Sequence, residues 1–178
     1  AEGTWRAAIR QPPRLPEGAI AHRDLAYVPN GHERQKLDLY LPKDGTNLPL
    51  IISIHGGAFR AGSKEQSAPL GYLQQGYAVA SINYRLSQHA KFPAQIEDCK
   101  AAVRWVRANS GRYHIDPDRF GAIGGSAGGH LVAILGTSYK ADKLEGAGGN
   151  PGVSSRVQAV VAMAAVTDFS AFSGRQLT

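Results

Sequence analysis

The sequence predicts an α/β fold of three layers, in which helices cover both faces of a mostly parallel sheet that has an antiparallel hairpin at its N-terminal side. Short apolar segments rich in β-branched residues alternate with helical patterns along the chain, an order typical of parallel strands joined by crossovers. Several of these segments, such as residues 50–54, are almost entirely apolar, as expected of strands that are buried on both faces. The length of 178 residues fits a single domain.

The first half of the chain is predicted to begin with a β-hairpin. Residues 25–28 and 36–41 carry β-favouring patterns, and Pro29-Asn30-Gly31 marks a turn between them. The same reasoning gives the other elements of this half: strands at 50–54 and 77–83, and a helix at 64–75 that Gly76 ends.

The clearest helix is predicted over residues 93–108. Its apolar residues recur at spacings of three and four, and Pro93 suits the first turn. The later elements are a strand at 120–123, a helix from the glycine-rich residues 124–129 to about Leu135, a polar loop at 140–155 and a strand at 157–166. We therefore expect six strands within a domain of residues 22–178, preceded by an extended arm of residues 1–21.

Composition excludes several classes of protein. Apolar residues make up 43% of the chain, and the longest apolar run, residues 159–166, is far shorter than the about 20 residues of a membrane span. The net charge of +6 is spread without a dense basic run, so no nucleic-acid partner is expected. The single cysteine, Cys99, excludes an internal disulfide. No metal and no cofactor are expected, and a start at Ala1 is compatible with a removed signal peptide or a trimmed chain.

The strongest chemical signal is Gly124-Gly125-Ser126-Ala127-Gly128, which matches G-x-S-x-G between a predicted strand and a predicted helix. A nucleophilic serine on a tight strand-to-helix turn needs small neighbours of this kind. Ser126 is therefore the candidate nucleophile. A glycine-rich phosphate-binding turn is the alternative, but the segment lacks the lysine of a P-loop and the G-x-G-x-x-G spacing.

A second signal, His55-Gly56-Gly57-Ala58-Phe59, follows directly after the strand predicted at 50–54. It matches an HGGG-type loop in which Ala58 replaces the third glycine, and such a loop turns backbone N–H groups toward a developing oxyanion. The predicted oxyanion hole consists of the N–H groups of Gly57 and Ala58 together with that of Ala127, which follows the nucleophile.

Four segments together resemble the hormone-sensitive-lipase-like branch of the α/β-hydrolases: HGGAF, YRLS at 84–87, the FPAQIEDCKAAVRWVR helix and GGSAGGHL. This branch includes bacterial carboxylesterases and feruloyl or acetyl-xylan esterase-like members, and the resemblance spans roughly residues 22–172. It implies a Ser-Asp-His triad with Ser126 as nucleophile, an acyl-enzyme mechanism on a small-molecule ester, and a structural role for His55.

The rest of the triad does not follow from the sequence. His130 is the last histidine, and as it lies one helical turn beyond Ser126 we expect it to pack rather than to act as the base. Asp168 follows the last predicted strand and could be the acid, or it could cap a turn; Asp98 is expected on a helix surface. If the strand predicted at 157–166 were the last of the sheet, its apolar edge would be exposed, which is an aggregation hazard. We therefore expect a fold that is incomplete at its C-terminal side. The chain would be truncated or cleaved, or another chain would complete it, either a complementing C-terminal segment or a second copy.

Three functions remain open from the sequence. The first is a serine carboxylic-ester hydrolase. The second is a non-catalytic relative that keeps the fold for binding, or a fragment that needs a complementing segment; the missing histidine favours it, and the intact serine turn counts against it. The third is an arylformamidase or a peptidase, which would use the same machinery with different acyl and leaving-group pockets.

Overall fold

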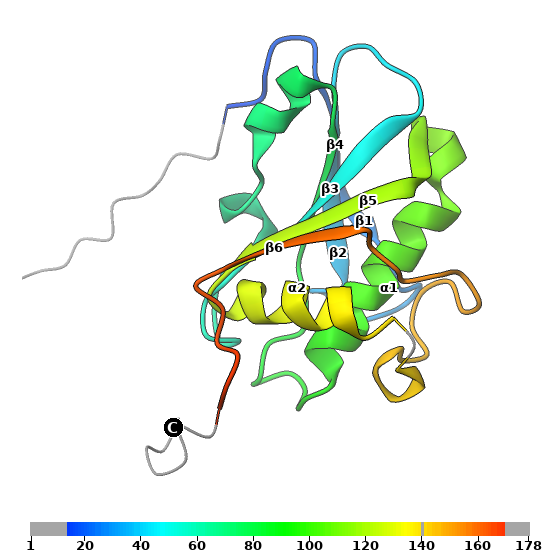
Figure 1. Ribbon diagram of the computed structural model, residues 1–178. Helices are drawn as coiled ribbons and strands as arrows, with labels where there is room; N and C mark the ends of the chain where they lie inside the picture. Colours follow the sequence, from blue (N-terminus) through cyan, green and yellow to red (C-terminus); the bar gives the residue numbers. More distant parts are fainter. Residues whose placement is uncertain (1–13, 140, 170–178) are drawn as a thin grey trace, which may run out of the picture.

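The computed structural model describes residues 14–139 and 141–169, which form one sheet with helices on both faces (Figure 1). The predicted α/β class is confirmed, and six strands lie within the described part of the chain. The strands are β1 (Ile20–Ala26), β2 (Lys36–Leu41), β3 (Leu48–Ile54), β4 (Ala78–Ile82), β5 (Ile115–Gly125) and β6 (Ala159–Met163). The α-helices are α1 (Ala94–Ala108) and α2 (Ala127–Thr137), and the 3₁₀ segments are η1 (Lys64–Gln66), η2 (Leu70–Gln75), η3 (Ser110–Tyr113) and η4 (Asp142–Leu144).

The strand order is β1-β2-β4-β3-β5-β6. The predicted hairpin is present, since β1 pairs antiparallel with β2, and β2 pairs antiparallel with β4. The strands β4, β3, β5 and β6 are parallel. β1 begins at Ile20, and residues 1–13 of the predicted N-terminal arm lie outside the described part of the chain.

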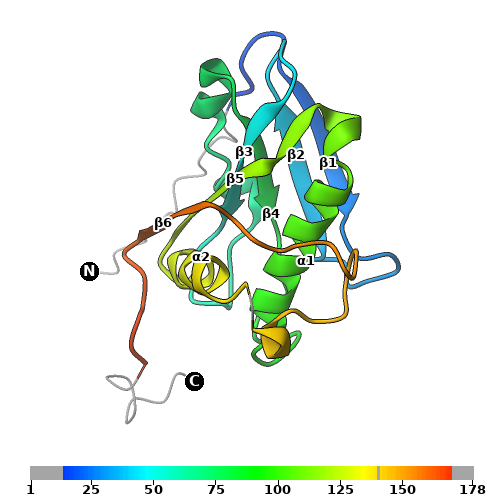
Figure 2. The ribbon, with the colours of Figure 1, turned by 45° about the vertical axis from the view of Figure 1, so that its right-hand side comes forward.

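Apolar side chains of the central strands pack on opposite faces of the sheet. Alternate residues such as Ala78 and Ala80 join the large core under α1 and α2, whereas Val79 belongs to a smaller core with Leu70 and Leu73 of η2. Figures 1 and 2 show α1 and α2 together on one face, with η1 and η2 on the other. The β-branched, apolar residues of β3 and β4 form strands here because both of their faces are covered.

The chain changes direction between β3 and β5, and this change positions the site. From β3 the chain crosses through η1 and η2 to β4, whereas from β5 it crosses through α2 on the other face to β6. The segments that leave β3 and β5 therefore diverge where these neighbouring strands end, with Ile54 paired to Gly124. Such a switch point opens a crevice at the carboxyl ends of parallel strands. The two predicted motifs, residues 55–59 and 124–128, meet at this crevice.

Several predicted elements differ from the structure. The strand predicted at 25–28 runs from Ile20 to Ala26, so it begins inside the predicted arm, and the strand predicted at 120–123 runs from Ile115 to Gly125. The helix predicted at 64–75 is two 3₁₀ segments, η1 and η2, separated around Pro69. A proline lacks the N–H that a helix needs and disfavours helical backbone in the residue before it, so the pattern cannot continue as one helix. Gly76 ends η2 in the left-handed conformation, as predicted.

The last strand, β6, is shorter than predicted and is exposed throughout, at the edge of the sheet. Ala164 has a φ of 45°, outside the extended region, and the strand ends before it. On the face opposite α2, a groove of about 500 Å³ runs over β3, β5 and β6. The predicted apolar edge is therefore present. No helix in the described residues is long and apolar enough to cross a membrane.

Candidate active site

Ser126 occupies a strained turn between β5 and α2. Its φ of 55° and ψ of −120° are those of the first central residue of a type II′ turn, a position that glycine normally takes. The N–H of Ser126 donates to the carbonyl of Met163 at 2.9 Å, and its carbonyl accepts the N–H of His130 at 3.0 Å. The turn is thus fixed from both sides, and the exposed serine lies at the helix N-terminus, where developing negative charge is favoured.

The loop after β3 carries three consecutive residues with positive φ: Gly57 at 111°, Ala58 at 51° and Phe59 at 61°. Left-handed backbone at the two residues other than glycine costs on the order of 1–2 kcal/mol each. The loop is closed by hydrogen bonds from the N–H groups of Arg60 and Ala61 to the carbonyl of Gly57, at 2.9 and 3.0 Å. Gly57 and Ala58 are exposed.

The serine turn and the loop are in close contact. A Cβ atom on Gly56 would lie 2.8 Å from the carbonyl oxygen of Gly125 and 3.4 Å from Cβ of Ser126. One on Gly128 would lie 2.1 Å from the carbonyl oxygen of Ile54. The backbone of α2 can therefore approach the end of β3 only because these positions have no side chain. The first α2 amides, including that of Ala127, precede the first intrahelical hydrogen bond, which His130 donates.

His55 lies buried behind this loop in a defined protonation state. Its Nδ1 lies 2.7 Å from the carbonyl oxygen of Gly56, and its Nε2 lies 3.1 Å from Nη2 of Arg34. Because a carbonyl only accepts and a guanidinium only donates, Nδ1 carries the proton and Nε2 is the acceptor. The ring stacks on Tyr84 at 4.3 Å. The pKa of His55 is lowered from 6.5 to about 4, chiefly by burial and also by the charge of Arg34, while the hydrogen bond to Gly56 and the carboxylate of Glu65 act in the opposite direction.

The lowered pKa of His55 predicts a loss of stability in mild acid. His55 binds a proton near pH 6.5 in the unfolded chain but only near pH 4 in the folded protein. The contribution of neutral His55 to the free energy of unfolding is therefore fully present above pH 6.5 and is lost as the pH falls toward 4. The loss is at most about 3 kcal/mol. Urea unfolding between pH 4 and 8 measures it, in the wild type and in His55→Gln.

The histidine at position 114 provides the control, because it is exposed. We expect His114→Asn to keep the wild-type change of the free energy of unfolding with pH. In His55→Gln the slope of this change should be smaller, by an amount that corresponds to at most one bound proton. A dependence on pH that His55→Gln leaves unchanged would contradict a buried neutral imidazole.

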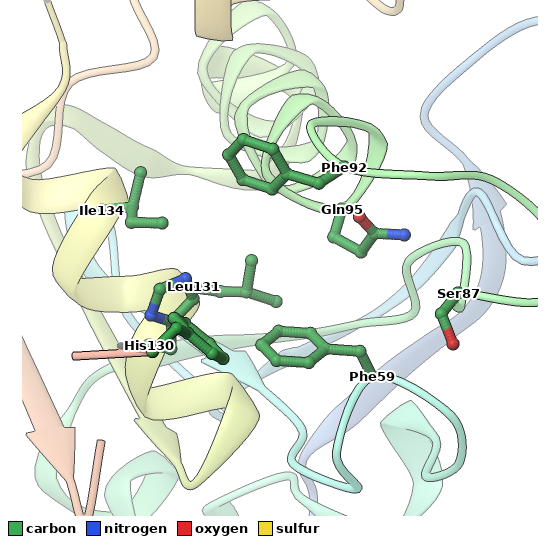
Figure 3. A pocket seen from close by; sticks show the side chains of 8 residues that line it. Phe59, Ser87, Phe92, Gln95, His130, Leu131 and Ile134 are labelled. Atoms are coloured by element: carbon green, nitrogen blue, oxygen red, sulfur yellow. The ribbon is translucent and has the colours of Figure 1, made fainter. Parts of the chain in front are cut away.

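His130 packs beside an apolar pocket. Its Nδ1 donates to the carbonyl of Val166 at 2.7 Å, and its ring meets those of Phe59 and Phe169 edge to face, with centroids 5.7 and 4.9 Å apart. In the described part of the chain, no histidine ring is hydrogen-bonded to Ser126. His130 has the packing contacts expected from the sequence. The pocket encloses about 450 Å³ and is lined by Phe59, Ser87, Phe92, Gln95, His130, Leu131, Ile134 and Phe169 (Figure 3).

Asp168, the candidate acid, is exposed in the segment after β6 and adjoins Phe169, which contacts the ring of His130. It stays a prediction. In the described residues no three histidine, cysteine or acidic side chains come together as metal ligands.

Sequence reasoning missed the contacts of two polar side chains, Asp98 and Arg34. Asp98, expected on a helix surface, is buried and forms an ion pair with Arg85 at 2.7 Å. It also accepts a hydrogen bond from Gln35 at 2.7 Å. Arg34 reaches His55 from the β1–β2 connection. A charged residue in a turn, such as Arg34, carries no local signal of such a contact. For Arg85 the one available signal was its place inside the YRLS segment.

The strand order and the strained serine turn at its switch point define an α/β-hydrolase fold. The model of the BD-FAE family matches residues 37–177, and the chain belongs to this family. It is 35% identical over 173 residues to esterase LipQ of Mycobacterium tuberculosis, covering 92% of this chain and 40% of LipQ. The chain thus spans about two fifths of the length of that curated relative.

Solved structures agree with this assignment. A bifunctional GH43-CE protein of Bacteroides eggerthii superimposes with a TM-score of 0.79 at 38% identity, over 84% of this chain and 21% of the other. A truncated carbohydrate esterase from gut microbiota gives a TM-score of 0.74 at 40% identity, over 80% of this chain and 55% of the other. The predicted relationship to carboxylesterase-type α/β-hydrolases is confirmed.

Proposed function

We propose that this chain carries the nucleophile and the oxyanion loop of a serine carboxylic-ester hydrolase. The observation that carries the proposal is the strained, exposed Ser126 packed against the backbone of the 55–59 loop. Strain of this kind persists only where the surrounding structure holds it, and it is concentrated at functional sites. The esterase relatives support an ester as the substrate.

In the proposed reaction, Oγ of Ser126 attacks the carbonyl carbon of the ester and forms a tetrahedral intermediate. The N–H groups of Gly57, Ala58 and Ala127 stabilise its oxyanion. The proton of Oγ passes to a general base and then to the departing alcohol, which leaves an acyl-enzyme. Water attacks this ester in turn and releases the carboxylic acid with the serine restored.

The general base is proposed to come from outside these 178 residues, on a complementing segment or a partner chain. His130, the last histidine of the sequence, donates Nδ1–H to Val166 and packs between aromatic rings. Asp168 is proposed as the acid only if that base reaches the edge after β6. No cofactor takes part in the proposed steps.

External imidazole tests this proposal. If the chain has its nucleophile and oxyanion donors but lacks its base, imidazole should accelerate the hydrolysis of p-nitrophenyl acetate and the labelling of Ser126 by a fluorophosphonate. Mass spectrometry of the labelled peptide identifies the serine. If imidazole hydrolyses the ester equally fast with and without the protein, and Ser126 carries no adduct, the result would favour a non-catalytic relative that keeps the fold for binding.

The apolar pocket is proposed to receive the acyl group. It lies beside the nucleophile, because Phe59 is the last residue of the 55–59 loop and His130 is one turn from Ser126 on α2. Figure 3 shows Phe59, Phe92, Leu131 and Ile134 around a common space. Its volume of about 450 Å³ accepts acyl groups from acetyl to an aromatic acid. Acetyl or feruloyl esters of plant polysaccharide are the proposed natural substrates, in line with the carbohydrate esterase neighbour.

Replacement of Ile134 by tryptophan should restrict the protein to shorter acyl groups. Each buried methylene contributes about 0.8 kcal/mol, so the two extra methylenes of a butyrate should raise kcat/KM about tenfold over acetate in the wild type. In Ile134→Trp we expect this preference to disappear, because the indole fills the pocket. Hydrolysis of the two p-nitrophenyl esters with imidazole present measures the ratio.

Val161→Trp is the control, since Val161 is 53% exposed on β6 and lines the groove on the opposite face. It should retain the wild-type ratio. An unchanged butyrate preference in Ile134→Trp would show that the acyl group binds elsewhere.

A further inference from the structure

Arg34 contacts the start of the oxyanion loop (residues 55–59) and the chain just beyond its end, although it lies far from the two motifs in sequence. It is half-buried in the connection between β1 and β2. Its Nη2 lies 3.1 Å from Nε2 of His55, where the loop begins, and donates to the carbonyl of Gly62 at 2.9 Å, three residues after the loop. Its Nε donates to the carbonyl of Tyr84 at 2.8 Å, beyond the end of β4. One rigid guanidinium therefore fixes three segments at once.

The partners of Arg34 are neutral. Within the described ranges, 14–139 and 141–169, it forms no ion pair, and its hydrogen bonds go to backbone carbonyls, an imidazole and the amide oxygen of Asn83. The neighbouring Gln35 instead binds Asp98 on α1. The two side chains thus anchor the same connection to different elements, and Arg34 is the one directed at the loop.

The contact with His55 has a geometric consequence for the oxyanion hole. Arg34 can only donate, so Nε2 of His55 must accept, and Nδ1–H then points at the carbonyl of Gly56, 2.7 Å away. That carbonyl belongs to the same planar trans peptide as the N–H of Gly57, and the two point in opposite directions. Holding the Gly56 carbonyl against His55 therefore directs the Gly57 N–H to the other side.

We propose that Arg34 is a positioning residue for the oxyanion loop, which acts by holding His55 as its neutral Nδ1–H tautomer and so aims the N–H of Gly57 toward the reacting carbonyl. The proposal rests on the proposed esterase function for the chemistry that Gly57 performs. Tyr84 completes the arrangement, since its hydroxyl donates to the carbonyl of His55 at 3.0 Å and its ring stacks on the imidazole.

Arg34→Met tests the proposal, because it keeps the length of the side chain and removes its donors. In long-range ¹H–¹⁵N spectra of the whole chain, the wild type should show His55 protonated on Nδ1 and unprotonated on Nε2 from pH 5 to 8. Arg34→Met should show exchange between tautomers. The amides of Arg60 and Ala61, which bond to Gly57, should exchange with solvent at least tenfold faster.

Turnover gives a second readout. Oxyanion donors act in the transition state, so imidazole-supported hydrolysis by Arg34→Met should lose about tenfold or more in kcat, with KM changed less than about twofold. Arg119→Met is the matched control: Arg119 binds Asp116 and the carbonyl of Asn47 near the opposite end of β5. It should leave the His55 spectrum and kcat unchanged.

The two readouts separate the possible failures. An unchanged His55 tautomer and unchanged exchange in Arg34→Met would overturn the positioning role, whatever the activity. If the wild type shows no hydrolysis that depends on Ser126, the esterase proposal fails, and the spectra still decide what Arg34 does. Should Arg34→Met not fold, Arg34→Lys keeps the charge but has a single donor nitrogen in place of the planar fork; a wild-type spectrum and a wild-type kcat in that variant would overturn the requirement for the guanidinium fork.

Discussion

Replacement of Ser126 by alanine should reduce imidazole-supported ester hydrolysis by at least about a thousandfold and abolish fluorophosphonate labelling. The reason is that the proposed reaction has no other nucleophile at the crevice where β3 and β5 end. The variant keeps the left-handed backbone at position 126 and removes one exposed hydroxyl, so its free energy of unfolding should change by less than about 1 kcal/mol. Initial rates and urea unfolding measure both quantities.

Ser87→Ala is the control for this experiment. Ser87 lines the apolar pocket beside Ser126. Its N–H donates to the carbonyl of Phe59 at 2.8 Å, a hydrogen bond that alanine retains. Ser87 has no positive φ and does not precede a helix. Labelling should therefore persist in Ser87→Ala. If labelling instead persists in Ser126→Ala, the assignment of the nucleophile is wrong.

The fold was predictable wherever a local pattern and the tertiary environment agree. The helix predicted at 93–108 is α1, Ala94–Ala108, because its apolar residues face the core under the sheet with the expected spacing. The helix predicted at 64–75 failed at Pro69, where backbone chemistry overrides the apolar pattern. The strand predicted to Val166 ends at Met163, because Ala164 leaves the extended conformation. Neither boundary depends on hydrophobicity.

The candidate site was predictable to the extent that motifs encode it. Both motifs follow parallel strands, and neighbouring strands of a parallel sheet place their ends together, so the approach of Ser126 to the 55–59 loop follows from topology. The support behind the loop does not. Arg34 is 21 residues from His55 in a segment with no periodic pattern, and only the folded hairpin brings its guanidinium to the imidazole.

Alanine at Gly128 should destabilise the fold by about 3 kcal/mol or more. A Cβ atom there would lie 2.1 Å from the carbonyl oxygen of Ile54 and 2.7 Å from that of His55. Both obstacles are backbone atoms at the end of a central strand, so the N-terminus of α2 must move away from β3. This loss outweighs the gain of up to about 1 kcal/mol that alanine brings to a helix. Urea unfolding measures the change.

Gly125→Ala isolates the steric cause. Gly125 lies in the same glycine-rich segment, on the other side of Ser126, but a Cβ atom there would meet nothing within 4 Å, and its φ is not positive. We expect its free energy of unfolding to lie within about 0.5 kcal/mol of the wild type. Because the same displacement separates the serine turn from the oxyanion loop, Gly128→Ala should also slow the labelling of Ser126, whereas Gly125→Ala should not. A Gly128→Ala variant as stable as Gly125→Ala would show that the end of β3 and the start of α2 do not pack as closely as this site requires.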